Sequence, residues 1–137
     1  MVSRRILAAG VLLLAACEGA GTAERGARYE LTGADGRLLP AFLGAASGGC
    51  LRLLEGGNVV LDGKNGFRAT YDIREKCNDS TRALPDPGTV GSFEVRNDTA
   101  FFTDSTGNPT GYGFITADSL VLQGSAHRLT YLRRHSE

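Results

Sequence analysis

The sequence predicts an all-β protein whose main domain is a small antiparallel up-and-down β-barrel of about eight strands. Short segments with alternating apolar and polar residues follow one another, separated by Gly, Asn and Asp turn signals. No segment after residue 27 carries an apolar stripe of helical length and period. A meander with short connections closes most simply into a barrel, because closure removes its unpaired edges. The pattern alone leaves a two-sheet β-sandwich as the alternative.

The first half of the domain contains its clearest strand. Residues 67–76, FRATYDIREK, alternate strictly between apolar and polar, which is typical of a strand with one buried and one solvated face. Earlier strands are expected at 27–32, 50–55 and 58–62. We expect Gly56 and Gly57 to form a tight hairpin between the last two of these. Residues 36–44 contain Pro40, which limits that stretch to an edge, a bulge or a loop.

The second half begins with a long connection. Residues 78–88 hold two prolines and several polar residues, so we expect a surface loop and not a strand. Later strands, joined by short turns, are expected at 89–96, 99–104, 112–117, 119–124 and 128–134. The alternation assigns these side chains to the interior: Tyr29, Leu31, Leu51, Leu53, Val59, Leu61, Phe67, Tyr71, Ile73, Phe93, Val95, Phe101, Phe114, Leu120, Leu122, Leu129 and Tyr131.

The N-terminal segment has the parts of an export signal. MVSRR supplies a positive end, and the apolar run ILAAGVLLLAA is too short to span a bilayer as a helix, which takes about 20 residues. The run ends in LAAC, residues 14–17, which resembles the lipobox of bacterial lipoproteins. This resemblance implies that Cys17 becomes the mature N-terminus and carries a diacylglyceryl anchor. Ordinary secretion with cleavage at a nearby small-residue site is the alternative.

The chain therefore divides into four predicted parts. They are a lipoprotein signal peptide (1–16), the lipidated Cys17 with a flexible tether (17–27), the β-barrel domain (28–134) and a short tail (135–137). Lipoprotein sorting in Gram-negative bacteria allows outer-membrane delivery when a residue other than Asp follows the cysteine. Since Glu18 follows it here, we expect the periplasmic face of the outer membrane.

The other two cysteines form a natural pair. With Cys17 lipidated, Cys50 and Cys77 remain in an exported and therefore oxidising compartment, and a disulfide between them is the default expectation. A metal site is the competing interpretation. His127 and His135 form no ligand pair with recognisable spacing, so the sequence does not support it.

The layout resembles the small lipocalin-like and META-like β-barrel domains found in many bacterial lipoproteins. YELTGADGRLLP is similar to their opening strand and the step that follows it, and GFRATYDIREKC to a strand that runs to a cysteine. GTVGSFEVRNDTAFF resembles their hairpin, and LTYLRR their closing aromatic and basic strand. The chain lacks the Gly-x-Trp signature of true lipocalins and is shorter than they are. The resemblance covers residues 28–134.

No catalytic, nucleotide-binding or metal motif is present in the sequence. There is no G-x-S-x-G elbow, no P-loop and no H-E-x-x-H pair, so we expect neither an enzyme nor a cofactor. Residues 104–108, DSTGN, have a faint likeness to a calcium loop, but a polar turn is the better interpretation. The formal net charge is +0, and no cationic stripe would bind nucleic acid.

Two functions remain. The first is an envelope lipoprotein, held at the membrane by its lipid, whose barrel binds a small apolar or amphipathic ligand. The aromatic residues expected to line that site are Tyr71, Phe93, Phe114 and Tyr131. The second is a structural or interaction lipoprotein with a filled barrel, whose long loop at residues 78–88 contacts an envelope protein.

Overall fold

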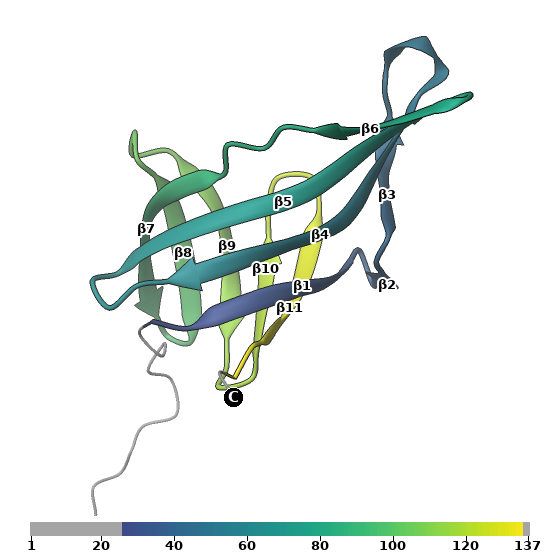
Figure 1. Cartoon of the computed structure of the whole chain (residues 1–137). Coiled ribbons are helices and arrows are strands. Elements are labelled where there is room, and N and C mark those ends of the chain that lie inside the picture. Colours follow the sequence, from purple (N-terminus) through teal and green to yellow (C-terminus); the bar gives the residue numbers. More distant parts are fainter. Residues whose placement is uncertain (1–25, 136–137) are drawn as a thin grey trace, which may run out of the picture.

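The computed structural model describes residues 26–135, and almost all of its regular structure is β-strand (Figure 1). The strands of the first half are β1 (Arg28–Ala34), β2 (Arg37–Leu38), β3 (Ala41–Ala45), β4 (Leu51–Leu61), β5 (Gly66–Cys77) and β6 (Ser80–Leu84). Those of the second half are β7 (Thr89–Arg96), β8 (Thr99–Asp104), β9 (Pro109–Ile115), β10 (Ser119–Gln123) and β11 (Arg128–Arg133). A 3₁₀ turn, Ser47–Gly49, lies between β3 and β4. Residues 26–135 contain no helix long and apolar enough to cross a membrane.

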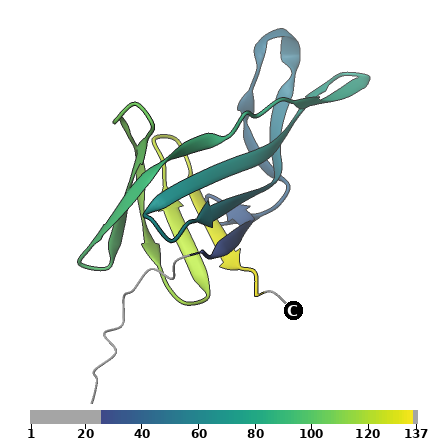
Figure 2. The ribbon, with the colours of Figure 1, turned by 60° about the vertical axis from the view of Figure 1, so that its left-hand side comes forward.

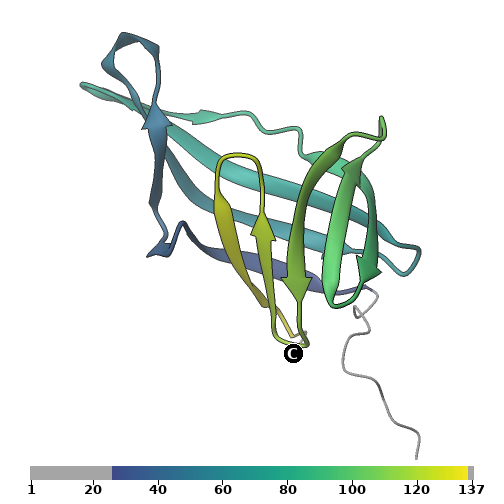
Figure 3. The ribbon, with the colours of Figure 1, turned by 180° about the vertical axis from the view of Figure 1, so that it is seen from behind.

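Eight of the strands form a closed antiparallel barrel. The ladder runs β1-β11-β10-β9-β8-β7-β5-β4, and β4 pairs again with β1. Tyr29 lies opposite Val59 at this last junction, and Leu31 lies opposite Tyr131 on the other side of β1. Because the ladder returns to its first strand, the predicted barrel is confirmed and the sandwich alternative is wrong. Figure 3 shows the β8 to β11 wall from the outside.

Of the remaining three strands, β2 pairs with the end of β1, and β3 and β6 extend the sheet on one side of the barrel. β4 and β5 are 11 and 12 residues long, and only one half of each takes part in the barrel. Their other halves are flanked by β3 and β6, which gives the order β3-β4-β5-β6. Figures 1 and 2 show this four-stranded sheet, hereafter the arm, projecting beyond the barrel wall.

The expected hairpin at Gly56 and Gly57 is wrong. Both glycines lie inside the continuous strand β4, and the β4–β5 register shifts between Leu54 and Gly56. A Cβ on Gly57 would lie 2.6 Å from the carbonyl oxygen of Thr70, so glycine allows the close approach of the neighbouring strand. The chain instead reverses after Leu61, in a turn where the backbone N–H of Asp62 donates to the carbonyl oxygen of Gly66 and the Asp62 carboxylate accepts from the Gly66 N–H.

The expectation that residues 78–88 form only a loop is also wrong. Ser80–Leu84 is strand β6, which pairs with the end of β5. Its sequence, STRAL, has no apolar alternation, and Ser80 to Ala83 are exposed. Apolar and polar residues alternate in a strand when one of its faces is buried. An edge strand that is exposed on both faces therefore shows no alternation.

Most of the expected interior is confirmed. The buried members are Tyr29, Leu31, Val59, Leu61, Phe67, Phe93, Leu120, Leu129 and Tyr131, and the half-buried members packed against them are Tyr71, Ile73, Val95 and Leu122. Ala100 and Phe102 lie inside in place of Phe101, which is 38% exposed. Leu51 and Leu53 lie on the outer face of the arm, because the bulge at Leu54/Gly56 adds a residue and reverses the alternation along β4.

Candidate ligand-binding site

One end of the barrel is packed with large side chains. Tyr29 is fully buried, and its hydroxyl donates to the carbonyl oxygen of Thr116 in the β9–β10 turn at 3.3 Å. Three phenylalanines pack in the middle of the barrel. The Phe102 ring lies edge-on to Phe67 at 5.1 Å and stacked with Phe93 at 5.8 Å. These rings fill the middle of the interior, as side chains do in eight-stranded barrels.

The opposite end, beside the β10–β11 turn, holds an open pocket of about 280 Å³. Its lining is mainly apolar, with hydroxyl groups and one imidazole: Val59, Phe67, Ala69, Tyr71, Thr89, Phe102, Thr110, Leu122, Gly124, Ser125, Ala126, His127 and Leu129. Seven of the eight barrel strands, all but β1, contribute to this lining or to the turn that completes it. A closed hydrogen-bonded ladder therefore holds the pocket open.

Two tyrosines form a hydroxyl pair at the pocket wall. The Tyr131 hydroxyl donates to the Tyr71 hydroxyl at 3.2 Å, and Tyr131 is fully buried. Burial raises the pKa of Tyr71, and it raises the pKa of Tyr131 strongly. The backbone N–H of Tyr71 donates to Asp86 at 2.6 Å, which fixes the β6–β7 connection beside the pocket. Both phenols are therefore neutral hydrogen-bonding groups over the physiological pH range.

His127 is held at the pocket rim by Asp35. The Asp35 carboxylate lies 2.7 Å from Nδ1 of His127, and it accepts a 2.9 Å hydrogen bond from the backbone N–H of Arg128. The Arg128 hydrogen bond, followed by His127, lowers the pKa of Asp35. An ionised Asp35 accepts hydrogen bonds only, so Nδ1 of His127 carries a proton and the ring orientation is fixed.

The structure separates the four aromatic residues that we expected to line one site. Tyr71 lines the pocket, and Tyr131 lies behind it as a hydrogen-bond donor. Phe93 is buried behind Phe102 and does not reach the pocket. Phe114 is 51% exposed on the outer wall, so its expected interior position is wrong. The inward residue beside it is Gly113, which lies opposite the buried Ala100.

Sequence reasoning missed part of the lining. Phe67, Leu122 and Leu129 were expected inside the barrel but were not assigned to a site. The β10–β11 turn, residues 124–127, carries no alternation that would indicate a pocket. His127, which the sequence analysis assigned to no site, is half-buried at the rim. The β1–β2 turn that holds it is distant in sequence and gives no local signal.

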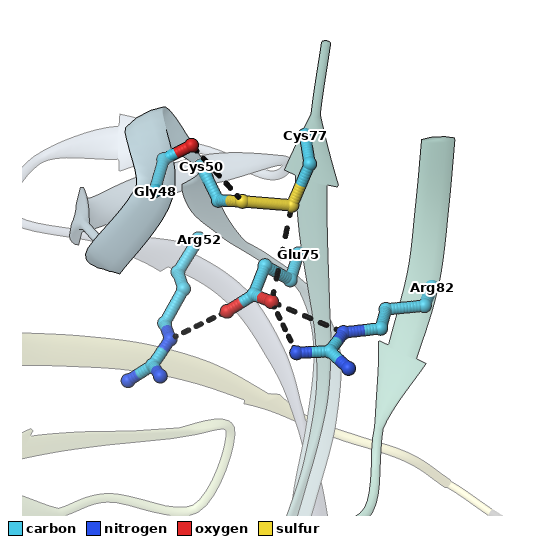
Figure 4. Close-up of a disulfide and its surroundings, with 6 residues drawn as sticks. All are labelled: Gly48, Cys50, Arg52, Glu75, Cys77 and Arg82. Atoms are coloured by element: carbon cyan, nitrogen blue, oxygen red, sulfur yellow. Dashed lines mark hydrogen bonds and ion pairs between the residues drawn. A yellow bond between two sulfur atoms is a disulfide. The ribbon is translucent and has the colours of Figure 1, made fainter. Parts of the chain in front are cut away.

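The predicted disulfide joins Cys50 and Cys77 across the tip of the arm (Figure 4). Next to it, Glu75 is buried on the face of β5 that continues the inner wall of the barrel. Its carboxylate accepts from Nε of Arg82 at 3.0 Å and from Nε of Arg52 at 3.4 Å. Arg82, followed by Arg52, holds the pKa of Glu75 below its usual value. The cluster joins β6 and β4 to β5 and stabilises the arm.

Two groups of potential metal ligands have other partners. Atoms of Cys50, Glu75 and Cys77 lie within 4.8 Å of one another, but the disulfide uses both sulfurs and the two arginines bind the carboxylate. In the β8–β9 connection, Asp104 accepts hydrogen bonds from the backbone of Thr106 and Asn108. This arrangement is a side-chain-closed turn, so residues 104–108 form the expected polar turn.

The described residues thus define a closed barrel with one packed end, one pocketed end and a disulfide-tied arm. Cys17, the expected lipid attachment site, lies outside the described residues. Comparisons with protein-family models, curated proteins and solved structures found no match to this chain.

Proposed function

We propose that this protein is a lipid-anchored bacterial envelope lipoprotein whose barrel binds a small apolar or amphipathic ligand. The observation that carries the binding function is the pocket of about 280 Å³ at one end of the barrel. Ligand pockets are commonly apolar clefts of roughly 300 to 1,000 Å³ with a few polar groups, so this pocket suits a small ligand. Its walls are barrel strands, which keeps the cost of ordering low on binding.

The sequence supports the lipid anchor. The LAAC motif ends an export signal, and the first barrel strand begins at Arg28. The ten residues between Cys17 and Arg28 reach at most about 33 Å, at roughly 3.3 Å per residue. A lipid on Cys17 would therefore keep the barrel close to the membrane surface.

A pocket-filling substitution tests the binding function. Leu122→Trp places a large ring in the pocket, and Leu132→Trp places the same ring on the outer face of the neighbouring strand, where Leu132 is exposed. The probe is 1-aminonaphthalene, which is small enough for the pocket and whose fluorescence emission shifts to shorter wavelength when it leaves water. We expect binding to the wild type and to Leu132→Trp, and at least a tenfold loss in Leu122→Trp. No binding to the wild type, or equal binding to all three proteins, would refute the proposal.

Metabolic labelling tests the anchor separately. Cells expressing the full chain are fed an alkyne analogue of palmitate, and the tagged protein is detected after click coupling. We expect a label on the wild type and none on Cys17→Ala. A labelled Cys17→Ala protein, or an unlabelled wild type, would contradict the assignment of Cys17.

The interaction function is the second candidate, and the outer face of the arm favours it. Phe42 of β3 and Leu51 of β4 are half-exposed there. A photo-crosslinking residue at position 42 would trap one specific envelope protein if this function holds, whereas the same residue at position 132 would not. Identical adducts from both positions would contradict it.

A further inference from the structure

The pocket limits the size of its ligand. A volume of about 280 Å³ corresponds to roughly nine water-sized groups, at about 30 Å³ each. The packed rings of Phe67 and Phe102 form part of its wall, so the pocket does not extend through the barrel. The ligand, or the part of it that enters, therefore has on the order of ten non-hydrogen atoms.

The charges around the pocket disfavour an anion. Within residues 26–135, no Asp, Glu, Lys or Arg lines it. The two neighbouring carboxylates are Asp35, beside His127, and Asp86, beside Tyr71. When His127 is protonated, Asp35 balances its charge, and when it is neutral the pair is negative. An anionic group entering the pocket would lose its hydration without meeting a net positive charge.

A cation also lacks a partner inside. Asp35 and Asp86 do not line the pocket, and each already accepts hydrogen bonds from backbone N–H groups. An ammonium group would reach neither carboxylate without leaving the apolar part of the site. The lining therefore suits an uncharged ligand.

The tyrosine pair supplies one directed donor. The buried Tyr131 hydroxyl has Tyr71 as its hydrogen-bond partner, so its proton points to the Tyr71 oxygen. The proton of the Tyr71 hydroxyl is then left to donate, and no other described residue accepts it. Because Tyr71 lines the pocket and burial keeps its phenol protonated, this donor faces a bound ligand.

We propose that the pocket selects an uncharged ligand of about ten non-hydrogen atoms that carries a carbonyl or similar acceptor for the Tyr71 hydroxyl. The apolar part of such a ligand lies against Val59, Leu122 and Leu129. This assignment rests on the proposed binding function and names the chemical class of its ligand.

Four probes of matched size test the assignment. Acetophenone carries a carbonyl acceptor, cumene has the same shape without one, benzoate is the anion and 1-phenylethylammonium is the cation. Their affinities are measured by NMR titration on the wild type, on Tyr71→Phe and on Tyr112→Phe. Tyr112 is the control, because it is an exposed tyrosine on the outer wall.

We expect the wild type to bind acetophenone and cumene, and to bind both ions at least tenfold more weakly than acetophenone. A net hydrogen bond of about 0.5 to 1.5 kcal/mol corresponds to a two- to twelvefold change in affinity. Tyr71→Phe should lower the acetophenone-to-cumene affinity ratio by that factor, and Tyr112→Phe should leave it unchanged. A general loss of packing would weaken the binding of both ligands and would leave the acetophenone-to-cumene affinity ratio unchanged.

The outcomes separate this inference from the proposed function. If no probe binds the wild type, both fail. If acetophenone and cumene bind but their ratio is the same in Tyr71→Phe, or if either ion binds as tightly as acetophenone, only the ligand class is wrong. Should Tyr71→Phe not fold, the ¹³C shift of the bound acetophenone carbonyl decides. A downfield shift relative to apolar solvent supports the hydrogen bond, and the apolar-solvent value excludes it.

Discussion

The paired phenylalanines of β8 allow a direct test of the barrel register. Phe102 is 1% exposed and contacts the rings of Phe67 and Phe93, whereas its neighbour Phe101 is 38% exposed and lies under the guanidinium of Arg96 at 4.5 Å. The sequence alternation assigned the inward position to Phe101. Replacing each residue by alanine therefore distinguishes the predicted register from the observed one.

The expected magnitudes differ several-fold. Truncating a buried Phe to Ala costs about 3 to 5 kcal/mol of unfolding free energy. The lost ring contacts of Phe102 favour a large value, but Phe102 also borders the open pocket, where water can enter the space that the ring leaves. We therefore expect about 3 kcal/mol for Phe102→Ala. Phe101→Ala should cost about 1 kcal/mol or less, because an exposed cation–π pair is worth about 0.5 to 1 kcal/mol.

Urea denaturation followed by far-UV circular dichroism measures both effects. With an m-value of about 1.5 kcal/mol/M, Phe102→Ala should lower the midpoint by about 2 M and Phe101→Ala by less than about 0.7 M. Phe102→Ala should also admit a probe larger than 1-aminonaphthalene, because the missing ring enlarges the pocket. Equal midpoints for the two variants, or a lower midpoint for Phe101→Ala, would refute the register and the pocket wall built on it.

Three other outcomes follow from the arm and the rim. Reducing the Cys50–Cys77 disulfide, which spans 27 residues, should lower the free energy of unfolding by about 3.5 kcal/mol according to the chain-entropy model. A reductant should therefore lower the urea midpoint, and an unchanged midpoint would contradict this prediction. Glu75→Gln should lower the melting temperature and speed amide exchange in β6, because it weakens the ion pairs with Arg52 and Arg82. The control Glu94→Gln, at an exposed ion pair, should do neither. Unchanged amide protection of β6 in Glu75→Gln would show that these ion pairs do not stabilise the strand. The folded pKa of Asp35 is lowered, so its stabilisation is complete above the ordinary pKa of an Asp, about 3.9, and is lost as the pH falls through the folded pKa. Asp35→Asn should therefore melt lower than the wild type near pH 7 and converge with it in acid, and a constant difference from pH 2 to 7 would exclude this role.

The closed barrel was predictable because, in most of its strands, the alternation of apolar and polar residues shows which side chains face inward. Alternation along β5 and β7, with short turns between later strands, determines both the strand type and the buried face. The signal fails where one residue is added or one side chain is missing. The bulge at Leu54/Gly56 reverses the faces of β4. In β9 the inward residue, Gly113, has no side chain, and the large residues on either side of it, Tyr112 and Phe114, are exposed. β6 gives no signal because its stabilisation comes from Arg82 and Glu75, which is a tertiary contact.

The site was less predictable than the fold, for a related reason. Alternation identifies residues that face the interior but does not say at what height along the barrel they lie. Tyr71, Phe93 and Tyr131 all point inward, yet only Tyr71 reaches the pocket. The heights depend on strand tilt and stagger, which follow from the closure of the whole ladder. The Asp35–His127 contact, which joins two turns, depends on the same closure.

The distribution of side-chain size explains why this barrel has a pocket. Eight strands enclose an interior just wide enough for side chains to fill, so an opening exists only where the inward residues are small. The packed end carries Tyr29, Leu61 and Leu120. The open end carries Ala69, Thr89, Thr110 and the small residues 124–126. A larger residue at Ala69 or Thr110 would fill the space without breaking the ladder, and the protein would then keep its fold and lose its pocket. The barrel fold therefore does not require the pocket. The proposed binding function accounts for the small inward-facing residues that leave it open.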